Sequence, residues 1–148
     1  MTPRQRSIAA TLVLVVAIVM LFYRSELLAQ HSPGIAAQIA AVLLMVWARL
    51  TFGRRSFHAA ANPTAGGLVT WGPYRYWRHP IYAAILLFVW VGIHSQHSPP
   101  SLPAILLAGV ATLMTAVRIQ AEETLLRSAY PEYATYEKKT KRIIPFVF

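Results

Sequence analysis

Residues 68–84, LVTWGPYRYWRHPIYAA, decide how the chain is organised, because a polar, cationic loop ends here and an apolar helix begins. Gly72-Pro73 predicts a turn, since glycine tolerates unusual backbone angles and proline presets one. Pro80 suits the first position of a helix, where its missing N–H would have no partner. The sequence therefore predicts a helix from Ile81 onward, whose N-terminus is surrounded by cationic and aromatic side chains. The free N–H groups of such a terminus favour anionic ligand groups.

The composition excludes a soluble globular domain. Of the 148 residues, 56% are hydrophobic and only 13% are charged, whereas soluble domains carry about 25% charged residues. The formal net charge is +9, but the basic residues fall in blocks between apolar runs, and no nucleic-acid-binding motif accompanies them. This pattern indicates membrane topology and contact with anionic lipid headgroups rather than nucleic acid. The absence of cysteine excludes disulfides, thiolate metal sites and a cysteine nucleophile.

Four apolar stretches predict an all-α integral membrane protein with four transmembrane helices in a single domain, residues 1–148. The predicted spans are residues 8–28, 35–52, 81–97 and 102–118. A polar connector, residues 53–80, separates the second span from the third. We expect the tail, residues 119–148, to begin as an extension of the fourth helix and to end in a short amphipathic helix after Pro131. A secretory signal peptide is the alternative for the first span, because basic residues precede its apolar core.

The basic residues alternate along the chain in a way that predicts orientation. Two Lys or Arg residues precede the first span, one follows it, five lie between the second and third, none between the third and fourth, and six after the fourth. Because cytoplasmic loops are enriched in Lys and Arg, both termini and the connector are predicted to be cytoplasmic, in a bacterial inner membrane. The connector, the end of the fourth helix and the tail would then meet at one face.

Glu122 and Glu123 are the second concentration of polar chemistry. Adjacent helical residues point about 100° apart, so one acid could face the bundle while the other faces water. A purely structural explanation exists, since Arg118 and Arg127 lie four residues away and could form ion pairs worth about 0.2–0.5 kcal/mol each. Acids at a membrane boundary, opposite a cationic helix N-terminus, are nevertheless costly unless they are used. We therefore interpret the pair as functional.

Other polar residues near the membrane have structural explanations as well. Arg78 could simply anchor the third span at the cytoplasmic edge, and its aromatic neighbours could belong to an interfacial belt. His79 is harder to explain in this way, because it precedes the helix-initiating proline and can donate to a carboxylate. His94 and His97 lie three residues apart, but two ligands without a carboxylate do not make a metal site. We predict no metal site.

The stretch LVTWGPYRYWRHPIY resembles the signature of the isoprenylcysteine carboxyl methyltransferase family, which is similar to the phospholipid N-methyltransferases. Further elements follow in the order of that family: Arg-x-x-x-Glu-Glu at 118–123, Glu-Tyr-x-x-Tyr at 132–136, and a basic-Ile-Pro ending that includes Arg142 and Pro145. The resemblance covers residues 49–145. Ala84 departs from it, because the family usually has glycine there, which lets a cofactor or helix approach closely. The extra methyl group would tighten or displace the cofactor pocket.

The resemblance implies an enzyme that uses S-adenosylmethionine as methyl donor, held between the Arg-His-Pro-x-Tyr segment and the glutamate pair. The expected cofactor-binding residues are Arg78, His79, Pro80, Tyr82, Glu122 and Glu123. We expect His79 and the amides after Pro80 to take the cofactor carboxylate. One of the two glutamates would take the ammonium group or the ribose hydroxyls, and Tyr82 would pack against the cofactor.

The expected acceptor is a lipophilic molecule or lipid that enters from the membrane. If its nucleophile is a carboxylate, Arg118 or Arg142 would hold it, since a guanidinium forks onto carboxylate oxygens. If the nucleophile is an amine, Glu122 would position it instead. Two alternatives remain, namely an NADPH-dependent enzyme similar to membrane sterol reductases and a non-catalytic lipid-binding membrane protein. The sequence does not define the oligomeric state.

Overall fold

The computed structural model describes residues 1–53, 67–96 and 99–143, and all regular structure in them is helical. The helices are α1 Pro3–Tyr23, α2 Ser32–Phe52, the 3-10 helix η2 Gly72–Arg75, α3 Pro80–His94, α4 Leu102–Ala129 and α5 Tyr133–Lys139. The predicted all-α class is confirmed for this part of the chain. Residues 54–66 of the predicted connector, together with His97 and Pro145, lie outside it.

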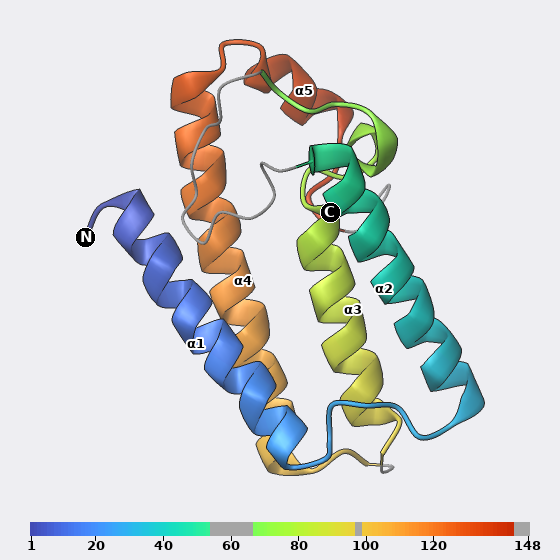
Figure 1. Ribbon diagram of the computed structural model, residues 1–148. Helices are drawn as coiled ribbons and strands as arrows, with labels where there is room; N and C mark the ends of the chain where they lie inside the picture. Colours follow the sequence, from blue (N-terminus) through green and yellow to red (C-terminus); the bar gives the residue numbers. More distant parts are fainter. Residues whose placement is uncertain (54–66, 97–98, 144–148) are drawn as a thin grey trace.

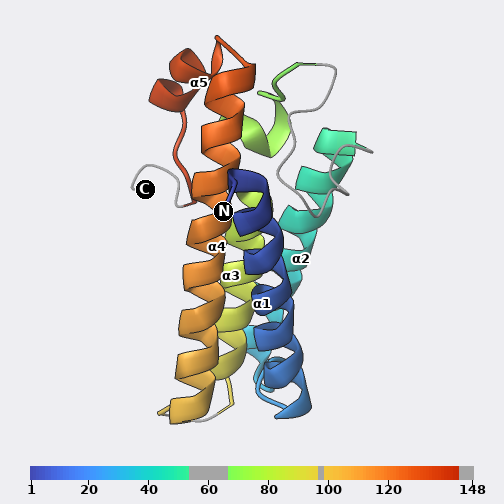
Figure 2. The same cartoon turned by 90° about the vertical axis from the view of Figure 1, so that its left-hand side faces the viewer.

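The four long helices form two antiparallel pairs that stand side by side. Helix α1 packs along α4, and α2 packs along α3 (Figure 1). The view turned by a quarter shows α5 lying across the end of α4 (Figure 2). The start of α1, the end of α2, the start of α3 and the end of α4 all lie at this end of the bundle. The basic ends of the helices therefore share one face.

The interior of the bundle is apolar, and so is much of its outer surface. Small buried residues let α1 and α4 approach closely: Ala10, Ala17, Ala108 and Ala111. Outward-facing leucines on three helices are more than 60% exposed: Leu12, Leu43 and Leu106. Helices α1, α2 and α4 are each long and apolar enough to cross a membrane. An apolar coat of this kind suits a lipid environment, whereas a soluble monomer would cover it.

The first predicted span is displaced along the chain. Helix α1 covers residues 3–23 rather than 8–28. It starts earlier because Thr2 and Gln5 form a capping box, in which each side chain accepts a hydrogen bond from the backbone N–H of the other. It ends earlier because Ser25 adopts a left-handed backbone conformation with φ of 56°, and a helix does not continue through such a residue.

The third predicted span is also shorter than expected. Helix α3 has 15 residues instead of the predicted stretch 81–97. At about 1.5 Å per residue it is roughly 22 Å long, less than the hydrocarbon core of about 30 Å. Three helices are therefore candidate spans in the described part of the chain, and a fourth complete crossing stays a prediction. Helix α4 continues without a break to Ala129, as the unbroken helical pattern predicted.

Gln38 joins α2 to the turn after α1 and to α3. Its buried side-chain amide accepts a hydrogen bond from the N–H of Ala29 at 2.9 Å, and donates to the carbonyls of Leu27 at 2.8 Å and Phe88 at 3.0 Å. Gly92 lies against this turn, since a Cβ added there would collide with the carbonyl oxygen of Leu27. The end of the bundle opposite the basic face is thus held by specific polar contacts.

We expect Gln38→Leu to lower the free energy of unfolding by about 2–3 kcal/mol, because it leaves buried backbone groups without partners. Thermal unfolding in detergent measures the effect. Gln120→Leu on α4 is the matched control, since Gln120 is exposed. Equal stability of the two variants would contradict the role given to Gln38.

Candidate functional site

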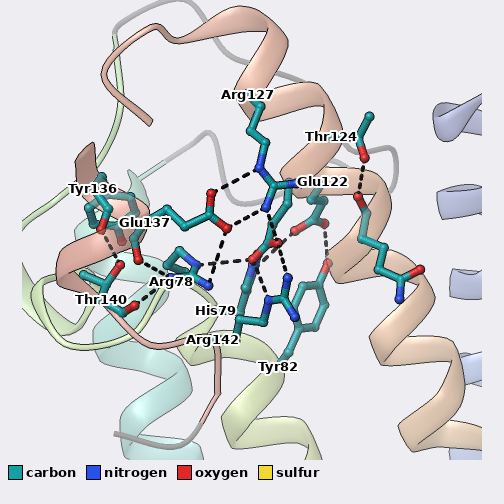
Figure 3. Close-up of polar contacts among 12 residues, drawn as sticks. Arg78, His79, Tyr82, Glu122, Thr124, Arg127, Tyr136, Glu137, Thr140 and Arg142 are labelled. Carbon is teal, nitrogen blue, oxygen red and sulfur yellow. Dashed lines mark hydrogen bonds and ion pairs between the residues drawn. The ribbon is translucent and has the colours of Figure 1, made fainter. Parts of the chain in front are cut away.

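The predicted site residues come together at the basic end of the bundle. Figure 3 shows side chains from the start of α3, the last turns of α4 and the tail pointing toward one another. Glu122 and Glu123 supply the acids from α4. Residues 78–82 supply the cationic and aromatic groups. The meeting of these two distant pieces of chain is what the sequence predicted.

Glu123 is the buried centre of this cluster, with 1% of its side chain exposed. Its Oε1 lies 3.2 Å from Arg78 Nε and 3.3 Å from His79 Nε2. Its Oε2 lies 3.1 Å from Arg127 Nη2. Arg142 forks onto both oxygens, at 3.2 Å from Nε to Oε1 and 3.0 Å from Nη2 to Oε2. Both carboxylate oxygens are therefore occupied by groups of the protein.

Glu122 faces a different set of partners and is more accessible, with 22% of its side chain exposed. The hydroxyl of Tyr82 donates to its Oε1. Arg118 Nη2 lies 3.2 Å from the same oxygen, and His79 Nδ1 lies 3.7 Å from Oε2. Of the two acids, Glu122 is the one with room for an additional cationic or hydroxyl group.

His79 connects the two acids. Its Nε2 faces Glu123 and its Nδ1 faces Glu122, so the neighbouring glutamates point in different directions and the imidazole ring spans them. The ring is held in place because His79 directly precedes Pro80, which is buried and begins α3. The helix signal in the sequence thus also fixes the position of a chemically active side chain.

Arg118 is buried and joins three helices. Its Nε donates to the hydroxyl of Tyr82 on α3 at 2.7 Å, and its Nη1 donates to the hydroxyl of Thr11 on α1. The guanidinium also lies over the Tyr82 ring, 5.5 Å from its centre. The helix ion pairs of the structural explanation, Arg118 with Glu122 and Arg127 with Glu123, do form. Each acid also has partners from other elements, which that explanation does not account for.

Arg78 holds the tail against the bundle. Its Nη1 donates to the carbonyls of Glu137 at 2.8 Å and Thr140 at 2.6 Å. Its backbone N–H and that of His79 donate to tail carbonyls at 2.7 and 3.1 Å. This pairing brings Arg142 to Glu123. The sequence analysis expected Arg78 to contact the cofactor, but in the structure its guanidinium contacts the tail. It expected Arg142 to hold the acceptor, but in the structure Arg142 contacts Glu123.

Four buried polar atoms in the described part of the chain have no hydrogen-bond partner: Ser7 Oγ, Trp77 Nε1, Thr115 Oγ1 and Tyr133 OH. Trp77 and Tyr133 lie on the tail side of the cluster, where the Tyr133 ring is 6.0 Å from the Arg127 guanidinium. Ser7 and Thr115 lie on α1 and α4. Buried polar groups nearly always have partners, so these atoms mark places where a ligand or water would supply one.

The family model described as the isoprenylcysteine carboxyl methyltransferase (ICMT) family matches residues 34–128, well over half of the chain. The protein belongs to this family. The matched range contains α3 and nearly all of α2 and α4, and with them His79, Glu122 and Glu123. Helix α1 and the residues from 129 onward lie outside the range matched by the family model. Their contacts with the site through Thr11 and Arg142 are features of this chain's structure.

Two curated relatives of this ICMT family member are named for metal resistance. Cobalt-zinc-cadmium resistance protein CzcN of Cupriavidus metallidurans is 37% identical over 78 residues, which is 53% of this chain and 35% of CzcN. Nickel-cobalt-cadmium resistance protein NccN of Alcaligenes xylosoxydans xylosoxydans is 36% identical over 78 residues, 36% of its length. The chain thus matches little more than a third of either relative. No solved structure matches the chain.

Three further observations concern residues or sites considered in the sequence analysis, or missed by it. Among the described residues, no group of three or more His, Cys, Asp or Glu residues could hold a metal ion. Ala84, at the position where the resemblance led us to expect glycine, is fully buried in α3. The sequence analysis did not identify Thr11 as a site residue. The sequence does indicate it, because Ser7 and Thr11 lie four residues apart and form a polar pair on one face of an apolar run.

Burial raises the pKa of Tyr133 and Tyr136, so both stay protonated at physiological pH. The pKa of Glu137 is lowered from its ordinary value of 4.5, chiefly because Arg127 donates hydrogen bonds to its carboxylate. Those contacts are 2.5 Å from Nη2 to Oε1 and 3.1 Å from Nε to Oε2. The charge of Glu137 therefore helps to hold α5 against the end of α4.

We expect this contribution to depend on pH. Because folding lowers the pKa of Glu137, the stabilisation is present above 4.5 and is lost as the pH falls through the lower folded value. The pair is partly exposed, so its contribution is below about 1 kcal/mol. Hydrogen exchange of residues 133–142, corrected for intrinsic rates, measures it. On acidification, the wild-type protein should lose more hydrogen-exchange protection than the Glu137→Gln variant. Equal losses in the two proteins would contradict the role given to the charge of Glu137.

Proposed function

We propose that this protein transfers a methyl group from S-adenosylmethionine to the carboxylate of a lipophilic acceptor in the membrane. Membership of the ICMT family supports methyl transfer. Three helices long and apolar enough to cross a bilayer support a membrane setting. The observation that carries the proposal is the imidazole of His79, which spans Glu122 and Glu123 at the start of α3.

The side chains at this site fit the polar groups of S-adenosylmethionine. Glu122 would hold the ammonium group, because its carboxylate is the more exposed of the two acids. The imidazole of His79 and the amides after Pro80 would take the carboxylate, aided by the positive end of α3. The buried, unpartnered hydroxyl of Tyr133 would meet a ribose or adenine atom. When bound, this cofactor supplies an electrophilic methyl group on its sulfonium.

Glu123 and Arg78 have a positioning role in this proposal. The carboxylate of Glu123 is already held by three guanidinium groups and one imidazole. Arg78 in turn fixes the tail by its contacts to two tail carbonyls. Both residues therefore act by holding His79 and the tail in place, and the ammonium group of the cofactor falls to Glu122 alone.

A carboxylate acceptor agrees with the charge of the cluster. Four arginines take part in it, Arg78, Arg118, Arg127 and Arg142, against three glutamates, Glu122, Glu123 and Glu137. An excess of positive charge attracts an anionic acceptor and repels an amine. Arg118 is the better placed holder, because it is buried at the junction of α1, α3 and α4. Transfer then needs the nucleophile held close and stripped of water rather than a proton shuttle.

The basic end of the bundle is assigned to the cytoplasm. It collects the start of α1, the end of α2, the start of α3 and the tail, and cytoplasmic segments are enriched in Lys and Arg. Both termini would be cytoplasmic, in a bacterial inner membrane. Anionic lipid headgroups would then contact this face, and the cofactor would reach the site from the cytoplasm.

Calorimetry with purified, folded protein in detergent tests the proposal. The wild type should bind S-adenosylmethionine or its demethylated product. His79→Ala and Glu122→Gln should each weaken binding by roughly tenfold, as expected for one charge-assisted hydrogen bond. His94→Ala is the control, since His94 is exposed at the far end of α3. Binding of NADPH in place of the methyl donor would favour the reductase alternative, and binding of neither would remove the enzyme proposal.

A further inference from the structure

Two hydroxyl groups between α1 and α4 are buried without a partner. Ser7 and Thr115 are each 0% exposed, and their hydroxyl oxygens make no hydrogen bond. A helical Ser or Thr normally bonds to the carbonyl four residues earlier. Other helical threonines in this chain do so: Thr11 to Ser7, Thr112 to Ala108, and Thr124 to Gln120. Ser7 and Thr115 differ from them, although an unpaired hydroxyl is costly in an apolar setting.

The position of these hydroxyls relates them to the site. Ser7 lies one turn before Thr11 on α1, and Thr115 lies one turn before Arg118 on α4. Thr11 and Arg118 are in contact. Because the two helices are antiparallel, Ser7 and Thr115 flank this contact on either side. The three hydroxyls of Ser7, Thr11 and Thr115, which we term the hydroxyl strip, therefore adjoin the buried guanidinium of Arg118.

We propose that the hydroxyl strip binds the head group of the methyl acceptor, an amphiphile with a carboxylate head and an apolar chain. The inference rests on the proposed function and names the place where its acceptor binds. Hydroxyl and guanidinium groups all donate hydrogen bonds to a carboxylate, whereas Arg118 would repel an ammonium head. The apolar chain would lie along the lipid-facing side of α1 and α4, where Leu12 and Leu106 are exposed.

The packing of α1 suits this role. Towards the basic end its buried residues are small, Ser7 and Ala10, whereas further along the helix Leu14 and Ala17 pack against Ala111 of α4. Its far end is held more firmly, because Leu21 belongs to the apolar core formed with α3 and α4. A sideways movement of the basic end of α1 therefore uncovers the hydroxyl strip while the far end stays packed. Ser7 and Thr11 lie outside the range matched by the family model, whereas Thr115 and Arg118 lie inside it, so the proposed site joins α1 to the matched part of the chain.

The experiment compares Ser7→Ala, Thr115→Val and the double variant with the wild type in detergent. Thr124→Val is the matched control, because Thr124 is exposed on α4 and bonds to its own helix. The probes are palmitate, hexadecanol and hexadecylamine, which share a chain and differ in the head group. Affinity for each probe, affinity for S-adenosylmethionine and thermal unfolding without probe are measured on the same samples.

We expect the wild type to prefer palmitate over the other two probes. The double variant should bind palmitate at least tenfold more weakly, because each lost hydrogen bond to a charged group weakens binding by roughly tenfold. Its affinity for S-adenosylmethionine and its unfolding temperature should not fall, because the removed hydroxyls bond to nothing in the folded protein. Thr124→Val should match the wild type throughout.

Three results would overturn the inference. These are unchanged palmitate affinity in the double variant, no preference of the wild type for palmitate, or a lower unfolding temperature that reveals a structural partner. If S-adenosylmethionine still binds the wild type, only the acceptor site is wrong. If the folded wild type does not bind S-adenosylmethionine, the proposed function itself fails.

Discussion

Replacing Glu123 with glutamine is expected to lower the free energy of unfolding by about 3–5 kcal/mol, the usual effect of removing one partner from a buried ion pair. The carboxylate is almost fully buried and faces Arg78, Arg127 and Arg142. A neutral amide would remove the negative charge that these three guanidinium groups share, although Arg127 would keep its ion pair with Glu137. Protection of the tail should also fall, because Arg142 loses its bidentate contact with the Glu123 carboxylate. Denaturant unfolding in detergent and hydrogen exchange of residues 133–142 measure the two effects.

The matched control is Glu132→Gln, the same change at an exposed position at the start of α5. Its effect should stay within about 0.5 kcal/mol, as for most surface substitutions. If Glu123→Gln were as stable as Glu132→Gln and kept its tail protected, Glu123 would not be the centre of the cluster.

The second large effect is expected for Arg118→Lys, which should lower kcat/KM for methyl transfer to a carboxylate acceptor by roughly 100-fold, or about 2.7 kcal/mol. Lysine keeps the charge but replaces a planar fork by a single ammonium group. It cannot hold Tyr82, Thr11 and Glu122 together as Arg118 does. Steady-state kinetics with varied acceptor and saturating cofactor measures the loss, while calorimetry follows cofactor affinity.

The comparison for this variant is Arg75→Lys, since Arg75 is exposed in η2 and close in sequence to the site. That change should leave kcat/KM within about twofold of the wild type, in keeping with an exposed side chain. An Arg118→Lys variant as active as Arg75→Lys would show that Arg118 holds the helices together without meeting the acceptor.

The start of α3 could be predicted from the sequence because its signals are local. A proline at the first helical position acts through its own ring and missing N–H, and Pro80 does begin α3. The continuation of α4 past Glu123 was equally readable, since no Pro or Gly interrupts residues 110–129. The same local signals placed His79 at the start of α3 and the two glutamates near the end of α4, and these two helix ends meet in the structure.

The burial of Glu123 could not be predicted from local signals in the sequence. Its carboxylate is enclosed because Arg142, 19 residues later, folds back onto it, and Arg78, 45 residues earlier, faces it from the segment just before α3. Such pairing depends on how the tail turns after α4, which no short pattern encodes. The shift of α1 has a different origin. A capping box at Thr2 outweighed the apolar count that set the predicted start at residue 8.

The most direct measurement follows a labelled methyl group. Membranes containing the protein are incubated with S-adenosylmethionine labelled in that group, and the lipophilic fraction is extracted and treated with base. Methyl esters release the label as methanol, whereas N-methyl groups retain it. The account predicts base-labile label that Glu122→Gln lowers at subsaturating cofactor and that Thr124→Val preserves. Base-stable label would contradict a carboxylate acceptor, and no label with a folded, cofactor-binding protein would contradict methyl transfer itself.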